Sequence, residues 1–509
     1  MRFRSLPAAV AAAAVLAVTV SGCTADPAPP SGEAADQVLT VGMQYDITDW
    51  DPAMAHVGAY LQPYQVAYDS LILREPDGTL APMLATEWEY DESLTTLTLE
   101  LRDDVTFSDD EAFDADAVVA NFEHFTTTNG RQAAQLSNYA SARAVDEFTV
   151  EVTLSQPDPA FTYFLSQAAG LMGSPAALDG DDIGLAPVGS GPYVLDASGT
   201  VAGSQYVFTP REDYWNADLQ KFGGVTLKVL ADTTARVNAL LSGQIDAGLI
   251  DAASAAQIEA AGLALNESEV DWLGMMILDR GGVVEPALAD VRVRQAINYA
   301  VDRSTLLESL QRGYGTVTSQ PFGENSGAFD PDLEDAYDYD PERAKELLAE
   351  AGYADGFTLR VPSIPIYETM FAALRQQFQD VNIALEPVSV PPQDYVTEIT
   401  SGKYPAAFYG LFQGEAWVSI NQMVSTTSLY NVFDSTTPEL QTMIDAVQNA
   451  PDEETGDASA VDVNRYVVEN AWFAPLYRPQ QLYVSASTVT VTPQTQMAVP
   501  SIYNFAPAK

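Results

Sequence analysis

The sequence predicts an α/β protein in which a parallel sheet is covered by helices. Strand and helix signals alternate along the 509 residues without a repeat of fixed period, and 47 % hydrophobic residues suffice for two or three lobes. The clearest signal is in residues 225–250, where an apolar strand precedes Asp232, a good helix N-cap. A helical stripe follows, Gly243 ends it, and a second strand returns. Such a unit places its two strands parallel in one sheet.

The N-terminal segment carries the signals of an exported protein. Arg2 and Arg4 form a basic start, and an apolar run follows over residues 8–20. This run is shorter than the roughly 20 residues that a bilayer-spanning helix needs. We therefore expect residues 1–22 to be a signal peptide that is removed from the mature protein.

Cys23 directly follows this segment and is the only cysteine of the chain. The run Val20-Ser21-Gly22-Cys23 resembles a bacterial lipobox, whose cysteine becomes the lipid-bearing first residue of the mature chain. The resemblance implies a lipid anchor at Cys23, a flexible tether over residues 23–37, and a place on the outer face of the cytoplasmic membrane. The alternative is an ordinary secreted protein with a free thiol. Without a second cysteine, the fold must be stabilised by its core and not by a disulfide.

Acidic residues dominate the composition. There are 71 Asp and Glu against 23 Lys and Arg, which gives a formal charge of -48. Nucleic acids and anionic lipid headgroups are therefore not expected as partners. The acidic residues are scattered along the chain, which favours a role in solubility over a dedicated cation site.

Two strands are expected before the strand–helix–strand unit. Residues 37–45 alternate between apolar and polar residues and predict an opening strand. Residues 97–107 place Leu97, Leu99 and Leu101 on one face, which is typical of a half-buried strand.

Two amphipathic helices are expected after that unit. Residues 290–303 begin at a capping Asp290 and carry an apolar stripe at helical spacing. Residues 340–353 begin at Asp340 and end at Gly352. Both stripes indicate core packing, so these helices are expected to build a lobe without contacting a ligand.

Five blocks of the sequence, in order, resemble the oligopeptide and dipeptide group of extracellular solute-binding proteins, family 5. They read LILREPDGTLAPMLATEWEY, LTLELRDDVTFSDDEAFDADAVVANF, VGSGPYVL, DVRVRQAINYAVDR and YDPERAKELLAEAGY. With gaps, the resemblance covers the chain from about residue 38 to its last residue. It implies a type II periplasmic-binding-protein-like clamshell: two α/β lobes joined by a hinge, with a subdomain inserted in the first lobe.

The resemblance also implies where the lobes begin and end. The first lobe is expected to use residues 38–75, 190–276 and 480–509, the inserted subdomain 76–189, and the second lobe 277–479. The tail after residue 480 alternates weakly and is expected to form edge strands.

Proteins of this family bind a solute between the lobes and deliver it to the permease and ATPase complex of an ATP-binding-cassette (ABC) importer, without catalysing a reaction. Contacts to both lobes form only on closure, so binding favours the closed state. We therefore expect a monomer without a cofactor that binds an oligopeptide or, as second choice, an oligosaccharide. A lipid-anchored glycoside hydrolase and a signalling receptor of the same fold are the alternatives.

The ligand contacts that the resemblance implies come from both lobes. The expected ligand-binding residues are Tyr45, Trp50, Asp279, Phe412, Gln413, Glu415, Trp417 and Asn421. Tyr45 and Trp50 follow the first strand, and most of the others lie within residues 409–423.

This chain departs from the family pattern at the expected site. Peptide-binding relatives usually carry an Asp-Pro-Asp element where this chain has Trp417-Val418-Ser419, so their anchor for the ligand's ammonium group is missing. Glu415 is placed to replace that acid. Alternatively, Trp417 and Trp50 stack on sugar rings. Asp279 replaces a common Asn, and Asp110 replaces a turn glycine but tolerates its left-handed backbone.

Metal and nucleophile motifs are absent from the sequence. The two histidines, His56 and His124, are far apart and do not form an HExxH zinc motif. No GxSxG elbow and no phosphate-binding P-loop occur. With 71 acids, carboxylate pairs arise by chance, so only geometry can test the hydrolase alternative.

Overall fold

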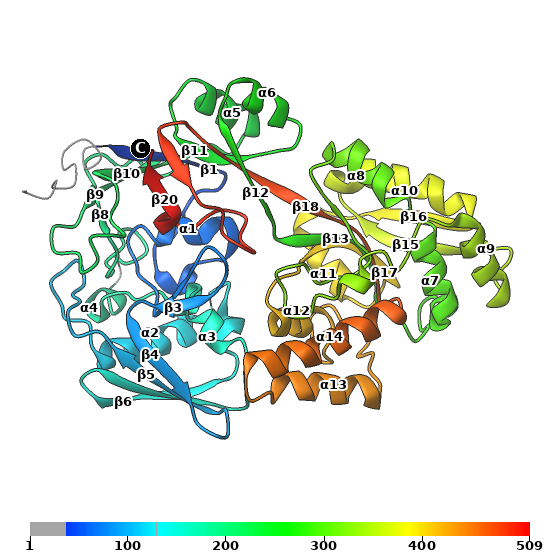
Figure 1. The fold of residues 1–509 in the computed structure, drawn as a ribbon, viewed down its shortest axis with the longest axis horizontal. Coiled ribbons are helices and arrows are strands. Elements are labelled where there is room, and N and C mark those ends of the chain that lie inside the picture. Colours follow the sequence, from blue (N-terminus) through cyan, green and yellow to red (C-terminus); the bar gives the residue numbers. More distant parts are fainter. Residues whose placement is uncertain (1–36, 129, 181, 509) are drawn as a thin grey trace, which may run out of the picture.

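The structure is a computed structural model that describes residues 37–128, 130–180 and 182–508. The predicted signal peptide, the lipid site at Cys23 and the tether up to residue 36 lie outside the described residues. Figure 1 shows two lobes side by side, with long strands running from one to the other.

One ten-stranded sheet extends through both lobes. Its order is β17-β13-β18-β11-β1-β10-β9-β8, and β12 and β14 pair with β18 outside this path. Its first-lobe strands are β1 (Val38–Met43), β8 (Tyr193–Leu195), β9 (Gln205–Pro210), β10 (Gly224–Val229), β11 (Ala247–Ile250) and β12 (Ala264–Glu269). β1 lies between β10 and β11 and is parallel to both, and α5 (Thr233–Leu241) connects those two strands. The predicted strand–helix–strand unit is therefore confirmed.

The caps predicted for this unit are also present. The Asp232 carboxylate accepts a hydrogen bond from the Ala235 N–H at 2.8 Å, which satisfies a donor at the start of α5. Gly243 has a φ of +68°, the left-handed backbone that ends a helix. A short helix, α6 (Ala255–Ala260), follows β11.

A four-stranded antiparallel sheet stands beside the first-lobe core, in the order β4-β5-β7-β6. Its strands are β4 (Ala85–Tyr90), β5 (Thr96–Leu101), β6 (Tyr139–Asp146) and β7 (Thr149–Leu154). Leu97, Leu99 and Leu101 are buried, as their alternation predicts, and share one core cluster with Phe122 of α2 (Ala115–Thr128). Asp110 has a φ of +69°, the left-handed backbone expected there. Smaller neighbouring elements are α1 (Leu61–Tyr64), β2 (Ile72–Arg74), β3 (Leu80–Pro82), α3 (Phe161–Phe164) and α4 (Pro175–Leu178).

The second lobe has hydrophobic cores of its own, drawn almost entirely from residues 272–477. A parallel pair of strands, β15 and β16, lies within it. Its strands are β13 (Asp271–Ile277), β14 (Gly315–Val317), β15 (Phe357–Ser363), β16 (Ile383–Ser389) and β17 (Ala406–Phe412). Its helices are α7 (Val291–Tyr299), α8 (Arg303–Gln311), α9 (Pro341–Glu350), α10 (Glu368–Asp380), α11 (Tyr395–Thr400), α12 (Ala416–Met423), α13 (Pro438–Gln448) and α14 (Glu453–Glu469).

The two predicted second-lobe helices differ in how well their ends were predicted. α9 begins after the capping Asp340, and Gly352 beyond its end has a φ of +88°, as expected. α7 begins after Asp290 but ends at Tyr299, four residues earlier than predicted. The reason is Asp302, whose carboxylate accepts from the Thr305 N–H at 3.0 Å and starts α8 as a separate helix.

The C-terminal tail was expected at a sheet edge, and this prediction is wrong for its first part. β18 (Phe473–Ser485) is the longest strand and lies inside the sheet, between β13 and β11. It pairs antiparallel with β13 in the second lobe and with β11 and β12 in the first. Its residues are mostly buried, so the weak alternation reflects burial on both faces. Beyond it, β19 (Val489–Val491) and β20 (Phe505–Pro507) form a small pair of their own.

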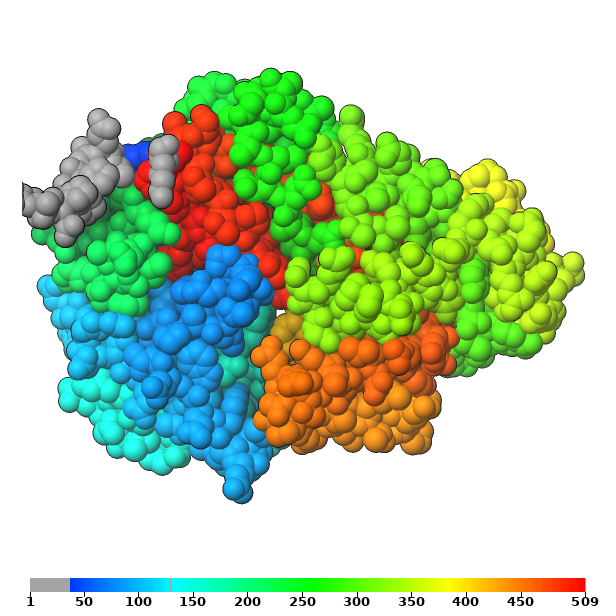
Figure 2. Space-filling view, in the orientation of Figure 1, coloured from blue at the N-terminus to red at the C-terminus, as the bar shows by residue number. Residues whose placement is uncertain are grey.

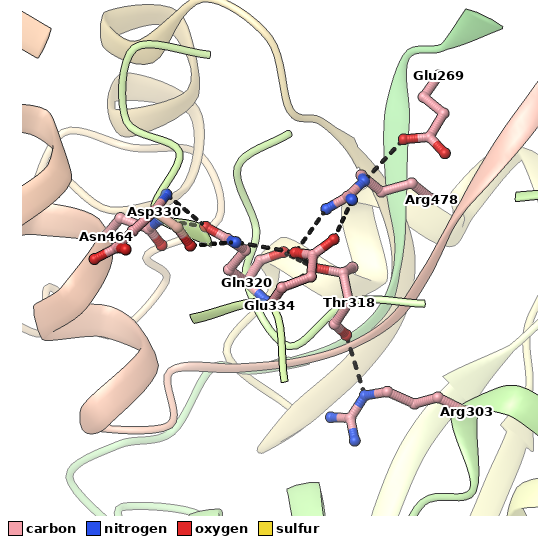
Figure 3. A network of polar contacts seen from close by, with 8 residues as sticks. All are labelled: Glu269, Arg303, Thr318, Gln320, Asp330, Glu334, Asn464 and Arg478. Atoms are coloured by element: carbon pink, nitrogen blue, oxygen red, sulfur yellow. Dashed lines mark hydrogen bonds and ion pairs between the residues drawn. The ribbon is translucent and has the colours of Figure 1, made fainter. Parts of the chain in front are cut away.

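A buried guanidinium fixes the point where the strands cross between the lobes (Figure 3). Arg478 of β18 is fully buried, and its Nε donates to the Glu269 carboxylate at the end of β12 at 2.8 Å. Its two terminal nitrogens donate to Glu334 of the second lobe. Glu334 also accepts from Thr318 at 3.0 Å and Gln320 at 2.9 Å. This network ties β12 and β18, the two strands that cross between the lobes, to the second lobe.

Candidate ligand-binding site

A cleft of about 670 Å³ lies between the lobes. Its walls come from residues 74–94 and 157–163 on the side of the first lobe, and from 325–327, 415–417 and 447–457 of the second lobe. Thr495 and Gln496 of the C-terminal tail complete it. Figure 2 shows a hollow where the blue first-lobe residues, the red tail and the second lobe meet. A volume of this size suits a small organic solute.

The cleft is strongly acidic. Its lining contains Asp77, Asp158, Glu415, Asp452, Glu453 and Asp457. Arg74 is the one basic side chain among the described residues that line it. The cleft therefore favours a ligand with a cationic group and offers one site for an anionic group.

Glu415 occupies the N-cap position of α12. Its carboxylate accepts from the Trp417 N–H at 3.1 Å and from the Val418 N–H at 2.5 Å. Burial nevertheless raises the pKa of Glu415 to about 7, and the nearby carboxylates of Asp158 and Asp457 act in the same direction. Near neutral pH this carboxyl therefore exists in both its protonated and its charged form.

Asp158 lies on the opposite wall of the cleft, in the segment just before α3. It is almost fully buried and accepts from Asn138 Nδ2 at 2.9 Å and from the Ala160 N–H at 3.1 Å. Burial raises the pKa of its carboxyl despite these hydrogen bonds. Asp158 and Glu415 therefore place two acidic groups with raised pKa values on facing walls.

Arg74, at the end of β2, is only 7 % exposed. Its Nη2 donates to the Gln496 side-chain oxygen, and its guanidinium carbon lies 5.1 Å from the centre of the Tyr163 ring. Burial raises the pKa of Tyr163, Arg74 opposes this, and the Glu415 carboxylate adds to it. Tyr163, Arg74 and Glu415 all line the cleft.

The lobes contact each other directly around the cleft. Gln448 Nε2 of α13 donates to the Pro157 carbonyl at 3.1 Å, and Gln496 Nε2 donates to the Asn325 carbonyl at 2.6 Å. Ala160, from the first-lobe side, is fully buried within a hydrophobic cluster of the second lobe. The structure therefore has the lobes closed on one another.

Two of the predicted site residues line this cleft. Glu415 and Trp417 do so, although Trp417 is only 4 % exposed. Tyr45 is 44 % exposed, but its ring stacks on Tyr60 with 4.7 Å between ring centres, away from the cleft lining. Trp50 is 2 % exposed and packs in the first-lobe core, with its ring centre 5.3 Å from that of Tyr206. The indole of Trp50 therefore presents no open face to a ligand in this structure.

The other predicted residues have structural surroundings. Asp279 is fully buried, and its carboxylate accepts from the backbone N–H groups of the following loop, which it holds in place. Gln413 is buried, while Phe412 and Asn421 are half-buried. None of these four side chains is among the residues that line the cleft.

Sequence reasoning missed Arg74, Asp158, Tyr163 and Gln496. Arg74 lies inside the first block that resembles the family, and no local pattern there indicates that its side chain lines a cleft. The other three come from distant parts of the chain, and only the fold brings them together.

Within the described ranges, no group of three or more histidine, cysteine, aspartate or glutamate side chains is arranged to hold a metal ion. Nor does any helix of the described residues have the length and apolar character needed to cross a membrane.

Comparison with known proteins gives consistent matches. The family model of bacterial extracellular solute-binding proteins, family 5 Middle, matches residues 79–431. The glutathione-binding protein GsiB of Salmonella paratyphi A is 30 % identical over 403 residues, 76 % of this chain and 74 % of that protein. HbpA2 from Haemophilus parasuis has a TM-score of 0.82 at 20 % identity, covering 93 % of this chain and 100 % of its own. The periplasmic binding protein DppA from Helicobacter pylori, in complex with the peptide STSA, has a TM-score of 0.77 at 19 % identity, covering 94 % and 99 %.

The structural matches establish the fold, and the sequence matches establish the family. The predicted α/β, two-lobed type II periplasmic-binding-protein fold is confirmed. The relatives are solute-binding proteins and not enzymes, as predicted, so the glycoside hydrolase alternative has no support. This chain belongs to the bacterial extracellular solute-binding proteins of family 5, which serve ABC importers.

Proposed function

We propose that this chain is the extracytoplasmic substrate-binding lipoprotein of an ABC importer and that its ligand is peptide-like. The observation that carries the proposal is the charge pattern of the cleft: carboxylates on both walls, with the Arg74 guanidinium beside them. A peptide with free ends carries an ammonium and a carboxylate and matches this pattern. The named ligands of two relatives, glutathione for GsiB and the peptide STSA for DppA, agree with it.

In this proposal, Glu415 takes over the role of the missing acid and binds the ligand's ammonium group. It lines the cleft from the N-terminus of α12, two residues before Trp417. A charged donor bound to a carboxylate makes a hydrogen bond about twice as strong as a neutral one. An ammonium group between Glu415 and Asp158 would also offset the repulsion between these two carboxylates.

The remaining parts of the proposal concern anchoring and delivery. Lipid chains on Cys23 would hold the protein, as a monomer, on the outer face of the cytoplasmic membrane. The first lobe would comprise residues 38–75, 190–276 and 480–509, with 76–189 inserted, and the second lobe 277–479. Closure over the ligand would create the shape that the permease recognises. Separate hydrophobic cores on the two sides support two lobes, and the second-lobe cores begin at Trp272, a few residues before the proposed boundary.

Oligosaccharide binding has less support. It relied on stacking of sugar rings on Trp50 and Trp417, and both indoles are almost completely buried. The acidic cleft also gives no advantage to an uncharged sugar.

The test is to identify the solute. Native mass spectrometry of the purified protein, followed by thermal-shift assays with glutathione, alanine peptides of two to four residues and malto-oligosaccharides, would measure which compounds bind. We expect peptides to raise the melting temperature of the wild type and to raise that of Glu415→Gln much less. If oligosaccharides raise it and no peptide does, the proposed ligand class is wrong.

A further inference from the structure

Arg74 differs from most of the other buried arginines of the described chain. Arg303 and Arg236 direct their nitrogens to backbone carbonyls, and Arg478 pairs with two carboxylates. Arg74 has a single hydrogen bond, from Nη2 to Gln496, and its Nε and Nη1 have no partner among the described residues. No carboxylate of the described chain pairs with it. Arg280 also has unpartnered nitrogens, but it stacks on Trp472 at 3.8 Å and lines no cleft.

Leaving such a group in place is costly. A buried guanidinium without its full set of acceptors loses hydration that the protein does not replace. The lining around it is acidic, yet no carboxylate is close enough to form an ion pair with it. If Arg74 were needed only for packing, an uncharged side chain of similar size would stabilise the fold equally well.

Two glutamines of the C-terminal tail contact Arg74. Gln494 Nε2 donates to the Arg74 and Glu75 carbonyls at 3.2 and 2.7 Å and so fixes the backbone at the end of β2. Gln496, which accepts from the guanidinium, has a φ of +59°, a left-handed backbone that is strained for this residue type. Arg74 also borders a second, small cavity of about 10 Å³, lined by Ser166 and Gln167 among others. The tail therefore fixes the backbone of Arg74 and one end of its guanidinium.

We propose that Arg74 binds an anionic group of the ligand, a carboxylate, so that the ligand spans the cleft between Glu415 and Arg74. This inference rests on the proposed function and adds a second recognition point to it. A guanidinium presents parallel N–H donors that match the two oxygens of a carboxylate. Tyr163, whose ring lies against the guanidinium, lines the cleft together with Glu415 and would line the path between the two ends.

The test compares alanine peptides of two to four residues as free acids and as C-terminal amides, with affinities measured by calorimetry. The wild type is expected to bind the free acid about ten-fold or more tightly than the amide, because the amide loses a charge-assisted hydrogen bond. Arg74→Met is expected to reduce this ratio below about two-fold, and Arg74→Lys to keep part of it, since lysine retains the charge without the fork. Equal binding of acid and amide by the wild type would overturn the inference and leave peptide binding intact.

Two controls separate recognition from structure. Arg102 also stacks on an aromatic ring, that of Trp215 at 4.2 Å, but does not line the cleft, so Arg102→Met should leave both affinities unchanged. Glu415→Gln should weaken the free acid and the amide equally and keep their ratio. A ligand-independent measurement comes from the melting temperature: Arg74→Met should leave it unchanged or raise it. A fall of more than about 3 °C, or an acid-to-amide ratio that persists in Arg74→Met, would show that Arg74 serves the fold instead.

Discussion

Replacing Glu415 by Gln is expected to change how stability depends on pH. Burial raises the pKa of this carboxyl from 4.5 to about 7, so the folded protein keeps a proton that the unfolded chain releases. Wild-type stability contributed by this group therefore falls as the pH rises from about 4.5 to 7, and stays low above that. The difference in pKa corresponds to about 3 kcal/mol at most, because one pKa unit equals about 1.4 kcal/mol.

Calorimetric melting of the wild type and Glu415→Gln at pH 5 and pH 8 measures this effect. At pH 5 the variant should be less stable, since glutamine caps α12 less well, at a cost of about 1 kcal/mol. At pH 8 it should be the more stable of the two, so that the difference in unfolding free energy moves by up to about 3 kcal/mol in its favour. The carboxyls of Asp69 and Asp271 also have pKa values raised to about 6, but they are present in both proteins and cancel.

A matched control is Glu454→Gln, which removes an exposed carboxylate from α14. The difference in unfolding free energy between this control and the wild type should be the same at both pH values, within about 0.5 kcal/mol. If Glu415→Gln behaves like this control, burial does not raise the pKa of the Glu415 carboxyl.

Three further predictions concern the crossing strands, the anchor and the cleft. Arg478→Met should lower the free energy of unfolding, measured in urea, by about 3–5 kcal/mol, because it leaves two carboxylates without their partner. The control Arg343→Met, at an exposed ion pair, should cost at most about 1 kcal/mol. Similar losses in the two variants would rule out a special role for the crossing point. Cys23→Ala should move the protein from the membrane fraction to the soluble fraction, and continued membrane association would contradict the lipid anchor. An N-acetylated peptide should bind more weakly at pH 8 than at pH 6, because at pH 6 the protonated Glu415 carboxyl can donate a hydrogen bond to a neutral acceptor. A peptide with a free amine should show no such loss. Equal pH profiles for the two peptides would speak against Glu415 as the ammonium site.

The sequence was most informative where structure is set by neighbouring residues. Asp232 and Asp340 cap the helices that they were expected to cap, and the alternation of residues 97–101 correctly predicted a half-buried strand. Prediction failed where a distant element decides the outcome. β18 lies inside the sheet because β13 pairs with one side of it and β11 with the other, and weak alternation in a single strand does not reveal two partners.

The same distinction applies to the candidate site. Glu415 was predicted as a replacement for the acid that relatives carry near Trp417, and it lines the cleft. Trp50 was chosen for its large flat ring, but that size also suits a core, and the fold uses it there. Arg74, Tyr163 and Gln496 are separated by up to 422 residues in the chain and meet only because the tail returns past β18 to the first lobe. No local pattern marks such a meeting.

The charges of the cleft also suggest why a zwitterion would be preferred. Closure brings Asp158 toward Glu415 and Asp457, and, in addition to burial, the repulsion between these carboxylates helps to raise the pKa of Glu415. The buried Ala160 and the Gln448–Pro157 hydrogen bond act in the opposite direction, because they form only when the lobes meet. In the proposed mechanism, the ligand's ammonium group removes the repulsion and its carboxylate pairs with Arg74. The ligand then needs to supply only the remaining difference in free energy between the open and the closed lobes. A small free-energy difference between the open and closed lobes suits an importer, because a ligand held with moderate affinity can be released when the permease reopens the lobes.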